Sequence, residues 1–166
     1  MYIDNDHYFM TEAYVSALKS KDQRTQVGVV IVGPDREIRM KAYNGPVRGF
    51  DEDWVQENRE RKTALCEHSE RNAIFNCARI GVSTMGCTMY ITMHPCVECA
   101  RAIYQSGIKE VIIHKERAAL PHYEQSFENA RVIFEKGGVL FREWSGWPLI
   151  SGVRVDGKMH KRLDDI

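Results

Sequence analysis

The chain has 166 residues, 43% of them hydrophobic, and its 23 basic and 23 acidic residues give a formal net charge of zero. This size and composition suit one domain with a substantial core. The balanced charge argues against nucleic acid as a partner, and no apolar run approaches the roughly 18 residues of a membrane span. Because the N-terminus also lacks a secretion signal, we expect a cytoplasmic protein that acts on a small molecule and has no membrane partner.

The first part of the chain predicts a helix followed by a β-hairpin. Either Asp4 or Asp6 can cap the helix. The apolar residues with helical spacing are Phe9, Ala13, Tyr14, Ala17 and Leu18. The apolar run 27–32 and the alternating segment 38–42 flank a Gly-Pro-Asp turn, which predicts two paired strands. The polar segment 45–62 predicts a long loop or a short helix over one end of the sheet.

The rest of the chain alternates helices and strands. A helix is expected around His68, with Gly81 as its C-terminal cap. One face of that helix carries Ala73, Ile74, Cys77 and Ile80. The following elements are a strand at 87–93, a helix at 96–105, a strand at 111–114, a helix at 122–136 and a strand at 139–144.

The connection between the last two predicted strands indicates how they pair. More than twenty residues, including a helix, separate these strands, which suits a parallel crossover and would be excessive for a hairpin. We expect residues 1–144 to form one domain, and residues 145–166 to form a loop or hairpin that extends it.

One pair of motifs carries the chemistry. His68-Ser69-Glu70 is followed by Pro95-Cys96-Val97-Glu98-Cys99. Structural zinc usually has four Cys and His ligands, whereas catalytic zinc has three and leaves a fourth position for water or substrate. His68, Cys96 and Cys99 supply three ligands, and no fourth Cys or His has a matching spacing. The pattern therefore predicts one catalytic zinc ion per chain.

The residue beside this site completes the prediction. Zinc in such a site lowers the pKa of its water to about 7. Glu70 follows the histidine by two residues and can carry a proton from that water to a leaving amine. Both ligand groups are expected at helix N-termini, where the helix dipole favours thiolates and where Pro95 fits because its missing N–H needs no partner.

Each half of the motif has a less specific interpretation. An isolated Cys-x-x-Cys can be a redox pair, and a single histidine on a helix is often a surface residue. Joined as His-x-Glu and Pro-Cys-x-x-Cys, the two halves are typical of zinc-dependent nucleobase deaminases. Of the remaining cysteines, Cys66 is expected near the metal without binding it, and Cys77 and Cys87 are expected in the core.

The sequence resembles the deoxycytidylate deaminase group of the cytidine deaminase-like superfamily, from about residue 20 to residue 141. The matching segments are 20–28 (SKDQRTQVG), 43–45 (YNG), 67–74 (EHSERNAI), 95–100 (PCVECA) and 105–111 (QSGIKEV). The zinc motif indicates the superfamily, and the other segments indicate the group. The resemblance implies an α/β, three-layer α/β/α fold with a five-stranded mixed sheet whose strands 4 and 5 are parallel. It also implies a homo-oligomer that hydrolyses the nucleotide dCMP to dUMP and ammonia.

The resemblance also implies roles for individual residues. His68, Cys96 and Cys99 would bind zinc, and Glu70 would be the catalytic proton carrier. Asn44 would contact the sugar hydroxyl, and the backbone of Ser69 would hold the pyrimidine carbonyl. Val27 and Pro95 are also included in the predicted substrate site.

A nucleotide substrate also needs a cation for its phosphate. The sequence offers Arg24, Arg48, Lys115 and Arg117 without ranking them, and we include Arg24 and Lys115 in the predicted substrate site.

Two alternatives from other classes stay open. A tRNA adenosine deaminase shares the zinc motif, although neutral charge and the segment 24–28 argue against it. A zinc-stabilised binding module without activity is the second alternative. Glu70 argues against that module because a structural zinc site needs no carboxylate beside it.

Overall fold

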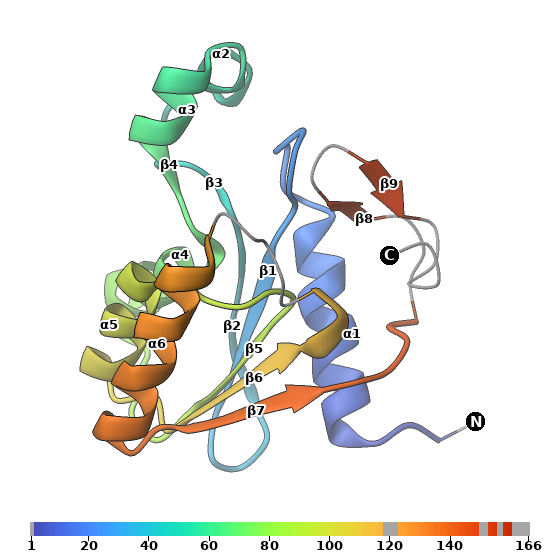
Figure 1. Cartoon of the computed structure of the whole chain (residues 1–166), viewed down its shortest axis with the longest axis vertical. Helices are drawn as coiled ribbons and strands as arrows, with labels where there is room; N and C mark the ends of the chain where they lie inside the picture. Colours follow the sequence, from blue (N-terminus) through green and yellow to red (C-terminus); the bar gives the residue numbers. More distant parts are fainter. Residues whose placement is uncertain (1, 118–122, 150–152, 156–157, 161–166) are drawn as a thin grey trace.

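A computed structural model of the chain describes residues 2–117, 123–149, 153–155 and 158–160. A five-stranded sheet lies at its centre, with the strand order β2-β1-β5-β6-β7 (Figure 1). These strands are β1 (Gly28–Val32), β2 (Ile38–Tyr43), β5 (Thr88–Ile91), β6 (Glu110–His114) and β7 (Leu140–Trp144). The hairpin predicted from the apolar run and the alternating segment is the antiparallel pair β1 and β2.

The sheet is mixed, as predicted. Strand β1 is antiparallel to β5, whereas β5, β6 and β7 run parallel to one another. The parallel pair β6 and β7 confirms the expected crossover, and helix α6 (Glu124–Gly137) makes that connection. Helix α5 (Val97–Gln105) connects β5 to β6 in the same way. Two consecutive parallel crossovers place the carboxyl ends of β5 and β6 at one edge of the sheet.

Helices cover both faces of the sheet. Helix α1 (Asn5–Ala17) packs on one face, and α4 (Ser69–Ile80), α5 and α6 lie on the other (Figure 1). Alternate residues of β1 enter two separate apolar clusters. Val30 packs with α1 residues, and Val29 packs with residues of α4, α5 and α6. Burial on both faces explains why residues 27–32 are continuously apolar. The predicted three-layer α/β/α fold is confirmed.

The ends of two helices refine the predicted apolar faces. Asp4 is the N-cap of α1, because its carboxylate accepts a hydrogen bond of 2.7 Å from the backbone N–H of His7. Leu18 and Ile80 were predicted on the apolar faces of their helices, but they are 43% and 64% exposed, so those faces do not extend to these two residues. Leu18 follows the last residue of α1, and Ile80 is the last residue of α4 before Gly81, whose positive φ of 73° ends the helix.

The segment between β2 and α4 forms an arm that projects from the sheet (Figure 1). It contains β3 (Gly45–Pro46), α2 (Glu52–Gln56), α3 (Arg59–Leu65) and β4 (Cys66–Glu67). Two short helices thus replace the single short helix or loop that was predicted. Ion pairs hold the arm to the segment before β1. Lys62 Nζ lies 2.6 Å from Asp22 Oδ1, and Lys21 Nζ lies 3.2 Å from Asp53 Oδ1.

The tail contains the expected hairpin. Strands β8 (Val153–Val155) and β9 (Lys158–His160) pair antiparallel. Residues 150–152, 156–157 and 161–166 of the predicted extension, and His122 at the predicted start of the last helix, lie outside the described residues. The division into 1–144 and 145–166 stays a prediction. None of the helices in the described part of the chain has the length and apolar character that crossing a bilayer requires.

A buried histidine makes the fold sensitive to acid. The His114 side chain is fully buried, with Nδ1 against the Tyr14 hydroxyl and Nε2 2.9 Å from Glu116 Oε2. Burial lowers the pKa of His114 to about 4, below the value of about 6.5 for an unfolded chain. The unfolded chain therefore takes up the proton first. His114 stabilises the fold above about pH 6.5, and this contribution is lost as the pH falls toward 4.

We expect the free energy of unfolding to fall over this pH range by at most about 1.4 kcal/mol per pH unit for this one group. Urea denaturation at a series of pH values measures that slope. The His114→Gln variant is expected to be less stable at neutral pH and to have a shallower slope. An identical slope in the variant would assign the acid sensitivity to other groups.

Candidate metal centre and substrate site

The three predicted metal ligands lie at the N-termini of two helices. His68 is the N-cap of α4, Cys96 is the N-cap of α5, and Cys99 lies in the first turn of α5. The histidine was expected inside the first turns of its helix and stands just before them. Neither His68 nor Cys96 caps its own helix with its side chain. Both side chains are therefore left to interact with each other and with Cys99.

The distances between the ligand atoms fit zinc. His68 Nδ1 lies 3.5 Å from Cys96 Sγ and 3.5 Å from Cys99 Sγ. A tetrahedral ion with bonds of about 2.0 Å to nitrogen and 2.3 Å to sulfur separates these atoms by about 3.5 Å. Within the described ranges, this is the one group of at least three potential ligands that converge in this way. A single zinc ion fits the donor set without rearrangement.

The group is open on one side only. Cys96 and Cys99 are buried, whereas His68 is exposed. A metal ion held here is consequently accessible to water and to a small molecule from the side of His68.

Contacts among the three side chains shift their pKa values. Hydrogen bonds from Cys99 and His68 lower the pKa of the Cys96 thiol to about 3. The same Cys96 group raises the pKa of His68 to about 9 and raises the pKa of Cys99. These shifts favour the thiolate at Cys96. Metal binding requires deprotonated ligands, so the affinity of the group for a metal depends on pH.

Glu70 lies beside this group and is buried. Its side chain is 4% exposed, and Oε2 accepts a hydrogen bond of 2.9 Å from Ser69 Oγ. Burial raises the pKa of the Glu70 carboxyl group, and the positive charge of His68 lowers it. A carboxyl group under these opposed influences can accept a proton and release it again.

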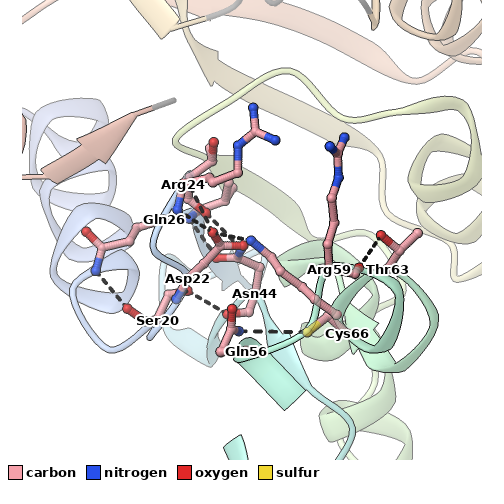
Figure 2. A network of polar contacts seen from close by, with 12 residues as sticks. Ser20, Asp22, Arg24, Gln26, Asn44, Gln56, Arg59, Thr63 and Cys66 are labelled. Atoms are coloured by element: carbon pink, nitrogen blue, oxygen red, sulfur yellow. Dashed lines mark hydrogen bonds and ion pairs between the residues drawn. The ribbon is translucent and has the colours of Figure 1, made fainter. Parts of the chain in front are cut away.

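The predicted sugar contact, Asn44, is held by a polar network (Figure 2). Its side-chain oxygen accepts a hydrogen bond of 2.8 Å from the backbone N–H of Val27. Its amide nitrogen donates to the Thr25 carbonyl at 2.9 Å and to Asp22 Oδ2 at 3.2 Å. Both amide hydrogens are therefore used. The remaining lone pair of the oxygen lets Asn44 accept one hydrogen bond from a ligand hydroxyl.

Asp22 is a residue of this network that sequence reasoning missed. Besides Asn44, its carboxylate accepts hydrogen bonds from the backbone N–H of Arg24 at 2.7 Å and from Lys62 Nζ at 2.6 Å. The sequence shows an acidic residue before a strand but not its partners, since Lys62 belongs to the projecting arm, forty positions away. Asp22 orients Asn44 and connects it to the arm.

The other predicted substrate residues lie beside Asn44 or within the two metal-binding motifs. Asn72 of α4 donates to the Tyr43 carbonyl at 3.0 Å, which joins the helix that begins at the metal centre to the chain next to Asn44. Ser69 and Pro95 are buried within the two motifs, and Val27 is partly buried beside Asn44. Val27 contacts Asn44 through its backbone N–H, and Ser69 and Pro95 directly adjoin the ligands His68 and Cys96 in the chain.

The predicted phosphate-binding cations are less closely grouped. Arg24 is exposed, and its guanidinium extends to the same side of the network as that of Arg59 (Figure 2). Lys115 is exposed and follows β6. Arg48 lies elsewhere, because its Nη2 donates to Asn76 Oδ1 at 2.6 Å on the outer side of α4.

A cavity of about 990 Å³ lies next to Arg48 and is distinct from the metal centre. It is lined by residues 41–43 and 45–50 and by α4 residues such as Phe75 and Arg79. None of the three metal ligands belongs to its lining. We therefore assign the chemistry to the His68, Cys96 and Cys99 group.

Comparison with known proteins gives consistent matches. Residues 3–115 match the family model described as the cytidine and deoxycytidylate deaminase zinc-binding region. The deoxycytidylate deaminases of Pongo abelii and Homo sapiens are 37% and 38% identical to this chain, and each alignment covers 93% of this chain and 86% of the relative. The crystal structure of the apo dCMP deaminase from cyanophage S-TIM5 has a TM-score of 0.68 at 22% identity. The match covers 87% of this chain and 100% of the cyanophage chain, which supports the fold.

We expect one zinc ion per chain in the purified protein, measured by elemental analysis. Replacing Cys99 by Ser should reduce the zinc content several-fold, because hydroxyl oxygen is a much weaker zinc ligand than thiolate. Cys66→Ser is the matched control, since Cys66 is two residues from His68 but outside the ligand group, and its zinc content should be normal. Loss of zinc from the Cys66 variant would show that the ligand set is wrong.

Proposed function

Because this chain belongs to the zinc-binding family of cytidine and deoxycytidylate deaminases, we propose that it hydrolyses dCMP to dUMP and ammonia. The main supporting observation is the convergence of His68, Cys96 and Cys99 next to the buried carboxyl group of Glu70. Three ligands and an adjacent proton carrier suit hydrolysis, whereas a structural zinc site has four protein ligands. Identity of 37% over most of both chains to a deoxycytidylate deaminase supports dCMP as the substrate.

In this proposal, His68, Cys96 and Cys99 hold one zinc ion, which when bound supplies a Lewis acid for activating water. Glu70 moves the protons. The oxygen of water joins C4 of the pyrimidine ring and the bond from C4 to the exocyclic nitrogen breaks. One proton of the water ends on the ring nitrogen N3 and the other leaves with the amine as ammonia. The buried carboxyl group of Glu70 can carry both in turn.

The remaining substrate contacts are part of the same proposal. Asn44 accepts a hydrogen bond from a sugar hydroxyl through the one lone pair that the network leaves available. The backbone of Ser69 holds the pyrimidine carbonyl, and Val27 and Pro95 flank the base. Arg24 and Lys115, both exposed, are candidates for the outer part of the phosphate site.

We further propose that the chain acts as a homo-oligomer in the cytoplasm and that residues 145–166 extend the catalytic domain. Exposed apolar side chains on α4 and α5 support assembly, since Phe75, Ile80 and Tyr104 are 54%, 64% and 46% exposed. None of the five cysteines, all of which lie in the described residues, forms a disulfide, which suits a reducing compartment. Light scattering of the purified protein tests the assembly.

The Glu70→Gln variant tests the proton carrier. The amide keeps the size of the side chain but cannot accept and release a proton, so we expect kcat for dCMP to fall by a factor of about 10² to 10⁴. Zinc content should be unchanged, because Glu70 is not among the ligands. Near-normal turnover in a zinc-loaded variant would contradict the role given to Glu70.

A substrate panel tests the reaction itself. Ammonia release is measured with dCMP, dCTP, deoxycytidine and a tRNA anticodon stem-loop, and we expect the highest kcat/KM with dCMP. Release from the RNA alone would support the tRNA adenosine deaminase alternative. A zinc-loaded protein that releases no ammonia from any of them would support the binding module.

A further inference from the structure

Arg117 is a buried cation, and none of the carboxylates in the described part of the chain forms an ion pair with it. Its side chain is 3% exposed, and Nη2 donates to the Gln26 carbonyl at 3.2 Å. For Nε and Nη1, the residues that the structure describes provide no hydrogen-bond partner. These two nitrogen atoms carry three N–H groups, and the guanidinium cannot lose its proton to avoid the cost of burial.

The described neighbours of Arg117 supply polar and aromatic contacts but no paired negative charge. The guanidinium carbon lies 5.5 Å from the centre of the Tyr14 ring, a favourable position for a cation. The adjacent carboxylate of Glu116 is directed elsewhere, because its Oε2 lies 2.9 Å from His114 Nε2. A buried charge with unpaired donors is costly to the fold and marks a position where an anion is expected to bind.

The location of Arg117 connects it to the proposed substrate site. It follows the carboxyl end of β6, and the neighbouring parallel strand β5 leads at its own carboxyl end to Cys96. Ligands of such sheets bind beyond the carboxyl ends of the strands. Gln26, which accepts the hydrogen bond of Arg117, directly precedes Val27, whose N–H is held by Asn44. The guanidinium is therefore attached to the segment that positions the proposed sugar contact.

We propose that Arg117 binds the 5′-phosphate of the substrate and makes the enzyme select nucleotides over nucleosides. This inference rests on the proposed function. A phosphate group has acceptor oxygens for the three unmet N–H groups and the charge that the site lacks. Arg24 and Lys115 are exposed, whereas Arg117 is buried and has little access to water.

The kinetic test compares two substrates that differ only in the phosphate. In Arg117→Met, we expect kcat/KM for dCMP to fall by a factor of about 10 to 100, mainly through KM, as for the loss of a charged hydrogen bond. The value for deoxycytidine should change by less than about twofold, and Arg117→Lys should be intermediate because it keeps the charge but not the planar donors. The control is Arg131→Met on α6, where the arginine is half exposed and 3.7 Å from Glu143, and it should change neither substrate.

Thermal unfolding distinguishes a ligand-binding cation from a structural one. If Arg117 is held for a ligand, the free Arg117→Met protein should unfold at the same temperature as the wild type or higher, since an unpaired buried charge is removed. Stabilisation by dUMP should be lost in this variant and kept in the Arg131 control, while stabilisation by deoxyuridine should be equal in all three proteins. A lower unfolding temperature together with an unchanged preference for dCMP over deoxycytidine would overturn the proposal.

The two proposals can fail separately. A wild-type protein that deaminates neither dCMP nor deoxycytidine would reject the proposed function. Inorganic phosphate would then test Arg117 on its own, through stabilisation of the wild type that is absent from Arg117→Met. An active wild type whose Arg117→Met variant loses both substrates equally would retain the proposed function and reject the phosphate contact.

Discussion

The separation of 3.5 Å between one imidazole nitrogen and two cysteine sulfurs is the constraint on which the proposed chemistry depends. Such a group forms only if two helices start at the same place, because His68 and Cys96 are the N-caps of α4 and α5. The sheet makes this possible. The parallel crossover from β5 through α5 to β6 starts α5 at the carboxyl edge, and the packing of α4 on β1 and β2 brings its first residue to the same edge.

The helix N-termini also account for the electrostatic character of the site. Backbone N–H groups and the positive end of each helix dipole favour thiolate at Cys96 over thiol, and hydrogen bonds from Cys99 and His68 act in the same direction. The neighbouring carboxyl group of Glu70 experiences the opposite influence, since burial favours its neutral form. Two acidic groups a short distance apart are thus shifted in opposite directions, as suits one metal ligand and one proton carrier.

A second group of contacts fixes the position of Asn44. These contacts depend on the projecting arm, which has little core of its own. The Asp22 carboxylate accepts a hydrogen bond from the side-chain amide of Asn44 and another from the ammonium group of Lys62, which belongs to the projecting arm. Of the arm helices α2 and α3, α2 buries only Val55 and α3 buries no residue in the described structure. The arm is therefore held largely by polar contacts near the proposed sugar site, and its position and that of Asn44 are coupled.

The sequence by itself determined the elements, the parallel crossover and the metal ligands, because periodicity and ligand spacing are local properties of the chain. His68, Cys96 and Cys99 have side chains that few other roles require in that combination, so their function could be predicted without coordinates. The sequence pattern overestimated the apolar faces at Leu18 and Ile80, since apolar spacing does not show where the packing of a helix against its neighbours ends.

Only the tertiary structure decided how the polar residues are used. Asp22 and Lys62 are forty positions apart, and Arg117 and Gln26 are ninety-one positions apart, yet each pair is in contact. Among the four cations that the sequence left unranked, burial separates Arg117 from Arg24, Arg48 and Lys115. The sequence does not show whether a charged side chain is hydrated or buried, because its solvation is set by the residues that folding brings around it.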